Sequence, residues 1–384
     1  GGIYLIRKVG LTLKDTRILG NNATNGGGIF AYDGSTINAD NATVSGNKAA
    51  NGGGLYLWNT SGSILADLRN SFIENNTATG WGGGIFTNTN VKINANNTKF
   101  LGNTANTAGG ILLWSNSSAT LDNSEVSGNK ATGNGGGVCV YDATCSLTAS
   151  NGTVFRENTA ASGGAIQNGG TLTVEDGVII SGNTATDFGG GILNNGVLTL
   201  KKGTSLVENS AGLYGGGLCS SGTVEVESGA KLYNNHAAQA GDDVYLFGKG
   251  STLTLTKVGD DWMLDDCGHK INGWFADLLD ARWDADGKQE HVINLKDYAA
   301  DGLTIVENED GSYTITILDE NATLALKAAH DVIPEPDPEP TPDPEPTPDP
   351  DTPDTPVSPE DPTTPPVQDA TPDEAETPVT PENP

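Results

Sequence analysis

ISGNTATDFGGGIL, residues 180–193, contains the two phrases whose repetition decides the fold. The first phrase is an apolar residue, two spacers and Asn, followed two residues later by Ala. The second is a glycine run that ends in an aliphatic residue. Both recur every 25 to 30 residues along the first 240 residues. This period is too short for the four strands of a propeller blade and carries no helical pattern, so it predicts the coils of a parallel β-solenoid.

The glycine phrase is found ten times in succession. Its copies lie at residues 1–3, 26–29, 52–55, 82–85, 108–111, 135–138, 162–166, 189–192, 215–218 and, degraded, 241–244. The asparagine phrase keeps step with it at residues 44–49, 100–105, 126–131, 155–160, 180–185 and 206–211. Between the phrases, short alternating runs such as STINA and TLTVE are typical of strands. We therefore predict an all-β chain of about nine coils, each with two or three short strands and no helix.

One position of the repeat is aliphatic in every coil. It follows the glycine run and is occupied by Ile3, Ile29, Leu55, Ile85, Ile111, Val138, Ile166, Ile192, Leu218 and Val244. Stacked coils lie about 4.8 Å apart, so each repeat position forms a column along the axis. A column that is always aliphatic predicts an inward row of the core, in which each buried side chain contributes about 1.5 to 3 kcal/mol.

Strand alternation sends the next residue of each coil outward. This position, and the one two residues further on, are mainly aromatic in the early coils and polar in the later ones. The candidate ligand-binding residues of this aromatic stripe are Phe30, Tyr32, Tyr56, Trp58, Phe86, Trp114 and Tyr141. If exposed, the stripe predicts a surface that stacks on sugar rings or docks a protein partner. The alternative is that the parity is reversed, or that a neighbouring turn covers the stripe and makes it ordinary core.

A column of asparagines comes from the other phrase. Its members are Asn47, Asn76, Asn103, Asn129, Asn158, Asn183, Asn209 and Asn235. A row of amides could bind a ligand, but stacked Asn side chains at a turn usually satisfy backbone groups and one another. We expect the structural role.

Composition divides the chain into three parts. Residues 1–250 hold the repeats, and all 19 prolines lie at or after Pro334. Residues 333–384 carry 15 acids and no Lys or Arg, so they are predicted to be a disordered, Pro-rich spacer. Residues 251–332 contain strand-like runs and a hairpin turn expected around residues 309–312. Because a solenoid needs its open end covered, we predict a small β-rich cap domain there.

The cap region contains half of the chain's six tryptophans, Trp262, Trp274 and Trp283. It also contains the turn Asp284-Ala-Asp286-Gly287, which is similar to part of a calcium loop. The full calcium pattern fails at its first and last ligand positions, so a plain turn is expected.

Charge and hydropathy narrow the possible partners. The net charge of −29 makes nucleic acid and anionic membranes poor partners. No apolar run approaches the length of a membrane span, so no membrane insertion is expected. The chain begins within a glycine phrase and ends within the spacer, so we expect a fragment of a longer protein with further coils upstream and any anchor outside it. The fragment itself is expected to be a monomer.

The four cysteines do not form a disulfide framework. Cys139 and Cys219 share a column three coils apart, roughly 14 Å, whereas a bridge needs Cα atoms within about 7 Å. Cys139 and Cys145 flank a short turn, and their pairing is left open. There is no CxxC motif and no Cys/His cluster, so we expect neither zinc nor any cofactor.

The two phrases resemble the GGAI and FxxN repeats of the polymorphic outer-membrane proteins of chlamydiae. The matching segments are residues 163–166 for the first motif and residues 72–75, 100–103 and 155–158 for the second. This resemblance covers about residues 1–245 and implies a right-handed β-helix displayed at a bacterial surface as an adhesin. Most copies have GGG where the family has GGA. The Pro/Asp/Glu spacer is instead similar to the wall-spanning stalk of Gram-positive surface proteins, which favours an extracellular, cell-wall-anchored protein.

A polysaccharide lyase or hydrolase is the rival class, because such enzymes are also β-helices. A hydrolase needs two carboxylates about 5 to 9.5 Å apart. Asp33 and Asp142 share a column four coils apart, roughly 19 Å. Asp242 and Asp243 lie on the last coil, where the columns beneath hold glycines. We therefore expect a non-catalytic adhesin that binds a glycan or a protein, with a structural stalk as a further alternative.

Overall fold

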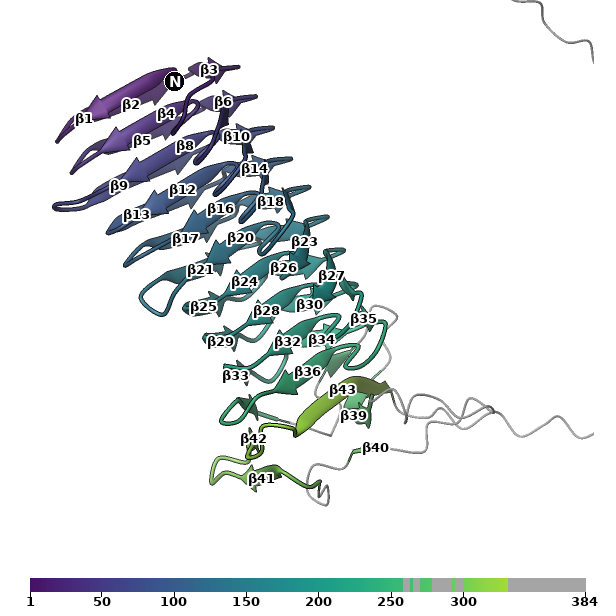
Figure 1. The fold of residues 1–384 in the computed structure, drawn as a ribbon. Coiled ribbons are helices and arrows are strands. Elements are labelled where there is room, and N and C mark those ends of the chain that lie inside the picture. The colour runs from purple at the N-terminus through teal and green to yellow at the C-terminus, as the bar shows by residue number, and fades with distance from the viewer. Residues whose placement is uncertain (258–262, 265–269, 278–291, 294–299, 331–384) are drawn as a thin grey trace, which may run out of the picture. The chain divides into compact units, whose positions relative to one another are not determined.

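The computed structural model describes residues 1–257, 263–264, 270–277, 292–293 and 300–330. Residues Gly1–Val332 form one compact unit, separate from Ile333–Pro384. The expected spacer, residues 333–384, lies outside the described residues, as do Trp262, Trp283 and the turn at residues 284–287. The described part is all-β, and its coils stack into a parallel β-solenoid (Figure 1).

Four parallel sheets run along the solenoid axis. Sheet A, which follows the glycine runs, contains β1 (Ile3–Ile6), β4 (Ile29–Tyr32), β8 (Leu55–Trp58), β12 (Ile85–Asn88), β16 (Ile111–Leu113), β20 (Val138–Val140), β24 (Ile166–Asn168), β28 (Ile192–Asn194), β32 (Leu218–Ser220) and β36 (Val244–Phe247). Sheet B contains β2 (Gly10–Lys14), β5 (Thr36–Asp40), β9 (Ile64–Arg69), β13 (Val91–Asn96), β17 (Ser118–Asp122), β21 (Ser146–Ser150), β25 (Thr171–Val174), β29 (Val197–Leu200), β33 (Thr223–Val226) and β37 (Thr252–Leu255).

The other two sheets are built from shorter strands. Sheet C contains β3 (Arg17–Leu19), β6 (Thr43–Ser45), β10 (Phe72–Glu74), β14 (Lys99–Leu101), β18 (Glu125–Ser127), β22 (Val154–Arg156), β26 (Ile179–Ser181), β30 (Ser205–Val207) and β34 (Lys231–Tyr233). Sheet D contains β7 (Lys48–Ala49), β11 (Thr77–Ala78), β15 (Thr104–Ala105), β19 (Lys130–Ala131), β23 (Thr159–Ser162), β27 (Thr184–Phe188), β31 (Ser210–Ala211) and β35 (His236–Ala237).

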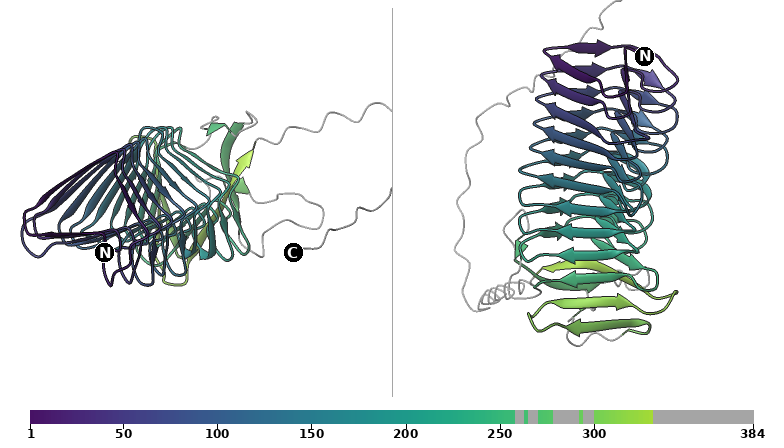
Figure 2. Two further views of the ribbon diagram at one scale, coloured as in Figure 1. Left: turned by 90° about the horizontal axis from the view of Figure 1, so that it is seen from above. Right: turned by 90° about the vertical axis from the view of Figure 1, so that its left-hand side faces the viewer.

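The number of strands differs in detail from the sequence expectation. Most coils contain four strands rather than two or three, because the asparagine phrase adds a strand of as few as two residues in sheet D. Ten parallel strands in sheet A give about ten turns, in agreement with the expected solenoid of about nine coils. Seen along the axis, the coils superpose with a gradual rotation from one to the next (Figure 2).

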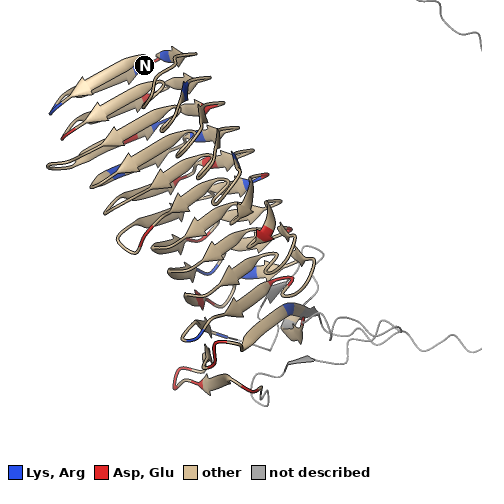
Figure 3. Ribbon diagram, in the orientation of Figure 1, with Lys and Arg blue, Asp and Glu red and all other residues tan. Residues whose placement is uncertain are grey.

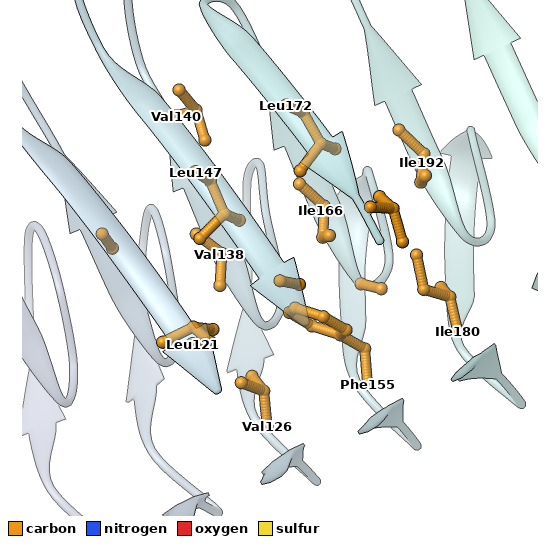
Figure 4. Packing of buried hydrophobic residues seen from close by; sticks show 14 of the residues in the cluster. Leu121, Val126, Val138, Val140, Leu147, Phe155, Ile166, Leu172, Ile180 and Ile192 are labelled. Carbon is orange, nitrogen blue, oxygen red and sulfur yellow. The ribbon is translucent and has the colours of Figure 1, made fainter. Parts of the chain in front are cut away.

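The predicted inward column is confirmed. Ile3 pairs with Ile29, and the same register continues coil by coil to Val244. From Ile29 onward these side chains are buried in one continuous core. Figure 4 shows side chains of sheet A (Val138, Ile166), sheet B (Leu147, Leu172) and sheet C (Phe155, Ile180) pointing into this interior.

The asparagine column is a structural ladder, as expected. The Asn103 side chain donates from Nδ2 to Asn129 Oδ1 (3.0 Å) and to the Ile73 carbonyl (2.8 Å). Its backbone N–H donates to the same Asn129 oxygen, and the pattern repeats from Asn47 to Asn235. All of these asparagines are buried, so the ladder satisfies polar groups at the turn between sheets C and D.

The glycine runs are required by the close approach of neighbouring coils. A Cβ on Gly136 would lie 2.3 Å from the Gly164 carbonyl oxygen of the next coil. Gly135, just before it, has a φ of 68°, a conformation that favours glycine. The lack of space for a Cβ and the positive φ together explain why the glycine phrase recurs in almost every coil.

The described strands of the carboxyl-terminal part continue sheets A and B. β37 pairs in parallel with β33, so the coils extend to Leu255 rather than ending at residue 250. The described strands beyond it are β38 (Met263–Leu264), β39 (Lys270–Ala276), β40 (Val292–Ile293), β41 (Leu303–Glu307), β42 (Tyr313–Ile317) and β43 (Thr323–His330). β43 pairs with β36 and β42 pairs with β37, both antiparallel, and these pairs cover the last coil. The predicted hairpin turn is present between β41 and β42.

Cys139 and Cys145 are free thiols, so the pairing left open by the sequence is not present. Cys139 lies on the outer side of sheet A, where its Sγ donates to Gln167 Oε1 (2.7 Å), whereas Cys145 packs in the interior core. In the part of the chain that the structure describes, no helix is long and apolar enough to cross a membrane.

Candidate ligand-binding face

The aromatic stripe lies on the outer side of sheet A, as the strand alternation predicts. Within β4, Ile29 and Ala31 belong to the interior core. Phe30, between them, belongs to a second cluster outside that core. The predicted assignment of inward-facing and outward-facing residues in this strand is therefore confirmed.

The inner row of the stripe is buried, so the alternative left open by the sequence, in which the stripe is covered, holds for this row. The exposed fractions of Phe30, Tyr56 and Phe86 are only 9%, 6% and 1%. Leu112 and Cys139 continue this row and are also buried. The rings cover one another from coil to coil, and Trp81 and Trp114 pack over them. Burial also raises the pKa of Tyr56, against a hydrogen bond with Asn88 that lowers it.

The outer row remains accessible. Trp58 is 37% exposed and Tyr141 is 47% exposed, whereas Tyr32 and Trp114 are half-buried. Asn88 occupies the position between Trp58 and Trp114, so the row has a polar gap in that coil. The accessible part of the stripe is thus narrower than the sequence indicates.

Ring contacts join the two rows into one array. Tyr56 stacks on Phe86 with ring centroids 4.8 Å apart. Trp58 packs edge-on against Tyr32 at 5.6 Å, and Trp114 stacks on Tyr141 at 4.9 Å. Aromatic pairs of this kind each contribute about 0.5 to 1.5 kcal/mol beyond the area they bury. The array therefore holds its exposed rings in fixed orientations.

Trp81 is a member of the array that the sequence analysis missed. It contacts Phe86 at 5.6 Å and Trp114 at 4.7 Å. It lies just before the glycine run, outside the alternating strand, and bridges to Thr107 of the next coil. An aromatic residue directly before a glycine phrase is the sequence feature that could have identified it.

The same signal marks a second group of rings in the last coils. Phe188 and Tyr214 also precede glycine runs, and their rings stack at 5.9 Å. Tyr214 stacks on Tyr245 at 4.5 Å, and Tyr245 contacts Phe247 at 6.0 Å. These four rings are half-buried; Tyr245 and Phe247 belong to β36 of sheet A, whereas Phe188 ends β27 of sheet D.

The acidic residues considered for catalysis have structural contacts. Burial opposes ionisation of Asp33, but hydrogen bonds from Thr60 and Ser61 outweigh it and lower the pKa of the carboxyl. Asp142 has a lowered pKa for the same reason, with donors from Thr144 and Ser115. Each carboxylate thus organises a turn after a sheet A strand, four coils from the other.

Asp242 and Asp243 also have structural contacts, at the end of the solenoid. Asp242 Oδ1 accepts from the Ala237 N–H (2.8 Å), and its Oδ2 accepts from Lys327 Nζ (3.0 Å). The described residues contain no group of three or more His, Cys, Asp or Glu side chains placed to hold a metal ion. Charged residues lie scattered along the coils (Figure 3).

Comparison with known proteins supports the resemblance of the repeat. The family described as the Chlamydia polymorphic membrane protein repeat matches residues 70–88. This segment contains one FxxN phrase, one glycine phrase, and Trp81 and Phe86 of the aromatic array. No curated protein and no solved structure matches the chain significantly. The match and the β-solenoid fold together establish a likeness to the repeats of that family of membrane proteins.

Proposed function

We propose that this chain is an adhesin-like, non-catalytic binding protein displayed outside the bacterial cell, and that its ligand contacts the aromatic array on sheet A. The observation that carries the proposal is the outer row, in which Trp58 and Tyr141 remain exposed on a rigid array. Large exposed rings held by their neighbours are suited to binding, because little side-chain entropy is lost when a ligand arrives.

The ligand class follows from the chemistry of this face. Indole and phenol rings bind sugar faces and apolar protein side chains, and they do so without charge. Extracellular glycans and surface proteins of a host or neighbouring cell present both kinds of group. The family likeness of residues 70–88 supports display at a surface, and the acidic Pro-rich segment supports anchoring through a cell wall.

A screen of the full 384-residue chain against a glycan and extracellular-matrix array tests the proposal. The variant Trp58→Ala with Tyr141→Ala removes the two exposed rings. The matched control is Ile179→Ala with Val197→Ala, which removes two apolar side chains of similar exposure on sheets C and B. We expect hits with the wild type and the control, and their loss with the aromatic variant. Hits that persist in the aromatic variant would place binding elsewhere.

A structural stalk is the second candidate function. It is favoured by the Asn ladder from Asn47 to Asn235 and by the register that sheet A keeps from coil to coil, which together favour a stiff solenoid. A stalk has no ligand to lose, so an array screen without any hit for the wild type would favour it.

A further inference from the structure

A polar pocket lies on sheet C, away from the aromatic array. It has a volume of about 320 Å³ and spans three successive coils beside the turn between sheets B and C. Its lining residues are Asn97, Lys99, Asn123, Ser124, Glu125, Gly152, Val154 and Arg156. The volume falls at the lower end of the range for small-molecule sites, about 300 to 1,000 Å³, so the pocket has room for one compact ligand.

Donors and acceptors alternate along the pocket. Glu125 lies between two cations and accepts from Lys99 Nζ at 3.1 Å and from Arg156 Nη2 at 2.5 Å. The other guanidinium nitrogen of Arg156 binds Glu157 at 2.9 Å. Burial opposes ionisation of Glu125, but its bonds with Lys99, Ser127 and Arg156 outweigh burial and lower the pKa of the carboxyl. The carboxylate is therefore an acceptor at neutral pH, flanked by a donor on each side.

One amide at the turn beside the pocket makes no side-chain hydrogen bond with the described residues. In other coils the equivalent asparagine donates across the coils, as Asn97 does to Asn70 (2.8 Å) and Asn151 does to Asp122 (2.9 Å). The Asn123 side chain lines the pocket and is exposed. It makes no hydrogen bond with another described residue. Asn123 thus adds a donor and an acceptor to the residues that line the pocket.

The charges of the pocket decide the class of ligand. Lys99 and Arg156 are already neutralised by Glu125 and Glu157, so an anion would have to displace a carboxylate. A cation would find only one carboxylate among the lining residues, that of Glu125, and this carboxylate is already paired with Lys99 and Arg156. A neutral molecule with several hydroxyl groups suits the pattern, because each hydroxyl both donates and accepts. Val154 offers an apolar contact for the C–H face of a sugar ring.

We infer that this pocket binds a single neutral sugar residue, with Glu125 accepting from its hydroxyl groups and Lys99, Arg156 and Asn123 donating to them. The inference does not rest on the aromatic array, because the pocket lies on a different sheet. Experiments can therefore refute one of the two proposed binding sites without refuting the other.

Saturation-transfer NMR of the full chain with methyl glycosides of glucose, galactose and mannose tests the inference. Methyl glucuronide serves as the anionic comparison. The variants are Glu125→Gln, which removes the charged acceptor, and Asn123→Ser, which leaves the ion pairs in place. The matched control is Glu227→Gln, which breaks the cross-coil ion pair of Lys201 and Glu227 (2.6 Å) outside the pocket. Thermal unfolding checks that each variant folds.

We expect saturation of at least one neutral glycoside, with affinity reduced about tenfold by Glu125→Gln and unchanged by Glu227→Gln. A smaller reduction is expected for Asn123→Ser, whose fold does not depend on the ion pairs. The inference is overturned if no neutral glycoside is saturated, if only the glucuronide is, or if both pocket variants bind like the wild type.

Discussion

Asp243 ends the asparagine ladder by occupying the place of the asparagine that a further coil would supply. Its Oδ1 accepts from the Asn235 N–H (3.1 Å) and from Asn235 Nδ2 (2.9 Å), the two donors that each ladder residue directs at its neighbour. Its Oδ2 accepts from the Ala328 N–H of β43 (2.7 Å). The aspartate can replace a glycine of the repeat because the antiparallel strand β43, rather than another coil, lies against it.

The buried Asp243 makes stability depend on pH. Burial raises the pKa of its carboxyl from 3.8 to about 7, although the hydrogen bonds from Ala328 and Asn235 act in the opposite direction. The folded chain then binds more protons than the unfolded chain between these values. The contribution of this group is fully present below about pH 4 and is lost as the pH rises through about 7. We expect a difference of a few kcal/mol at most.

The variant Asp243→Asn isolates this group. Because the variant has no proton to lose there, its Tm relative to the wild type should rise between about pH 4 and pH 8. Thermal unfolding of both chains across this range measures the change. A difference in Tm that stays constant with pH would show that Asp243 titrates alike in both states.

Asp33 should show the opposite pH dependence. The donors of Thr60 and Ser61 lower the pKa of its carboxyl, so its contribution is present above the ordinary value of 3.8 and is lost as the pH falls below it. In Asp33→Asn this contribution is absent at every pH. The wild type should therefore exceed the variant in Tm near neutral pH, and the two should converge under acid. A gap that widens under acid would contradict the assignment.

Two glycine-to-alanine variants distinguish the effect of steric crowding between coils from the effect of backbone strain at a positive φ. Gly182→Ala places a Cβ in open space, so only the φ of 64° opposes it, at about 1 to 2 kcal/mol. Gly136→Ala places a Cβ 2.3 Å from a backbone oxygen of the next coil, and neither atom can move freely. Urea unfolding should show a clearly larger loss for Gly136→Ala. Equal losses would mean that the coils can separate locally to admit a methyl group.

The Asn ladder should be sensitive to loss of one member. Asn103→Ala removes the shared acceptor of the Asn76 N–H and Nδ2 and the side-chain donor to the Ile73 carbonyl. Each unsatisfied buried group costs about 1 to 3 kcal/mol. The exposed Asn106, whose side chain donates to Thr132 and accepts from Thr107 at the surface, provides the control Asn106→Ala. Denaturant unfolding should show a loss of several kcal/mol for the first variant and little change for the second.

The two rows of the aromatic array should differ in their effect on stability. Phe86 is buried, so Phe86→Ala should cost about 3 to 5 kcal/mol. Trp58 keeps 37% of its exposure, so Trp58→Ala should cost less. Unfolding free energies of the two variants measure this. If Trp58→Ala is as destabilising as Phe86→Ala, the outer row is a structural element and the proposed binding role loses its support.

The coil register and the direction of the stripe could be predicted from the sequence because both depend on strict periodicity. An aliphatic residue follows every glycine run, from Ile3 to Val244, and strand alternation then fixes which neighbours face outward. The role of the Asn column followed in the same way. Features that recur in each coil are visible in a single sequence.

The sequence left open whether Phe30, Tyr56 and Phe86 are buried, because their burial depends on contacts between different repeat positions. Trp81 covers part of this row from a segment outside the strands, and no other early coil has an aromatic residue there. The end of the coils at Leu255 was missed for a similar reason. β37 follows the degraded last phrase and is recognised as part of the solenoid by its parallel pairing with β33.

The dissociation constant of a ligand identified by the array screen tests the central claim most directly. It should be measured for the wild type, for Trp58→Ala with Tyr141→Ala, and for the control Ile179→Ala with Val197→Ala. We predict that the aromatic variant binds at least about tenfold more weakly, a loss of about 1.4 kcal/mol, while the control binds like the wild type. Equal dissociation constants for all three folded proteins would contradict a binding role for the aromatic array.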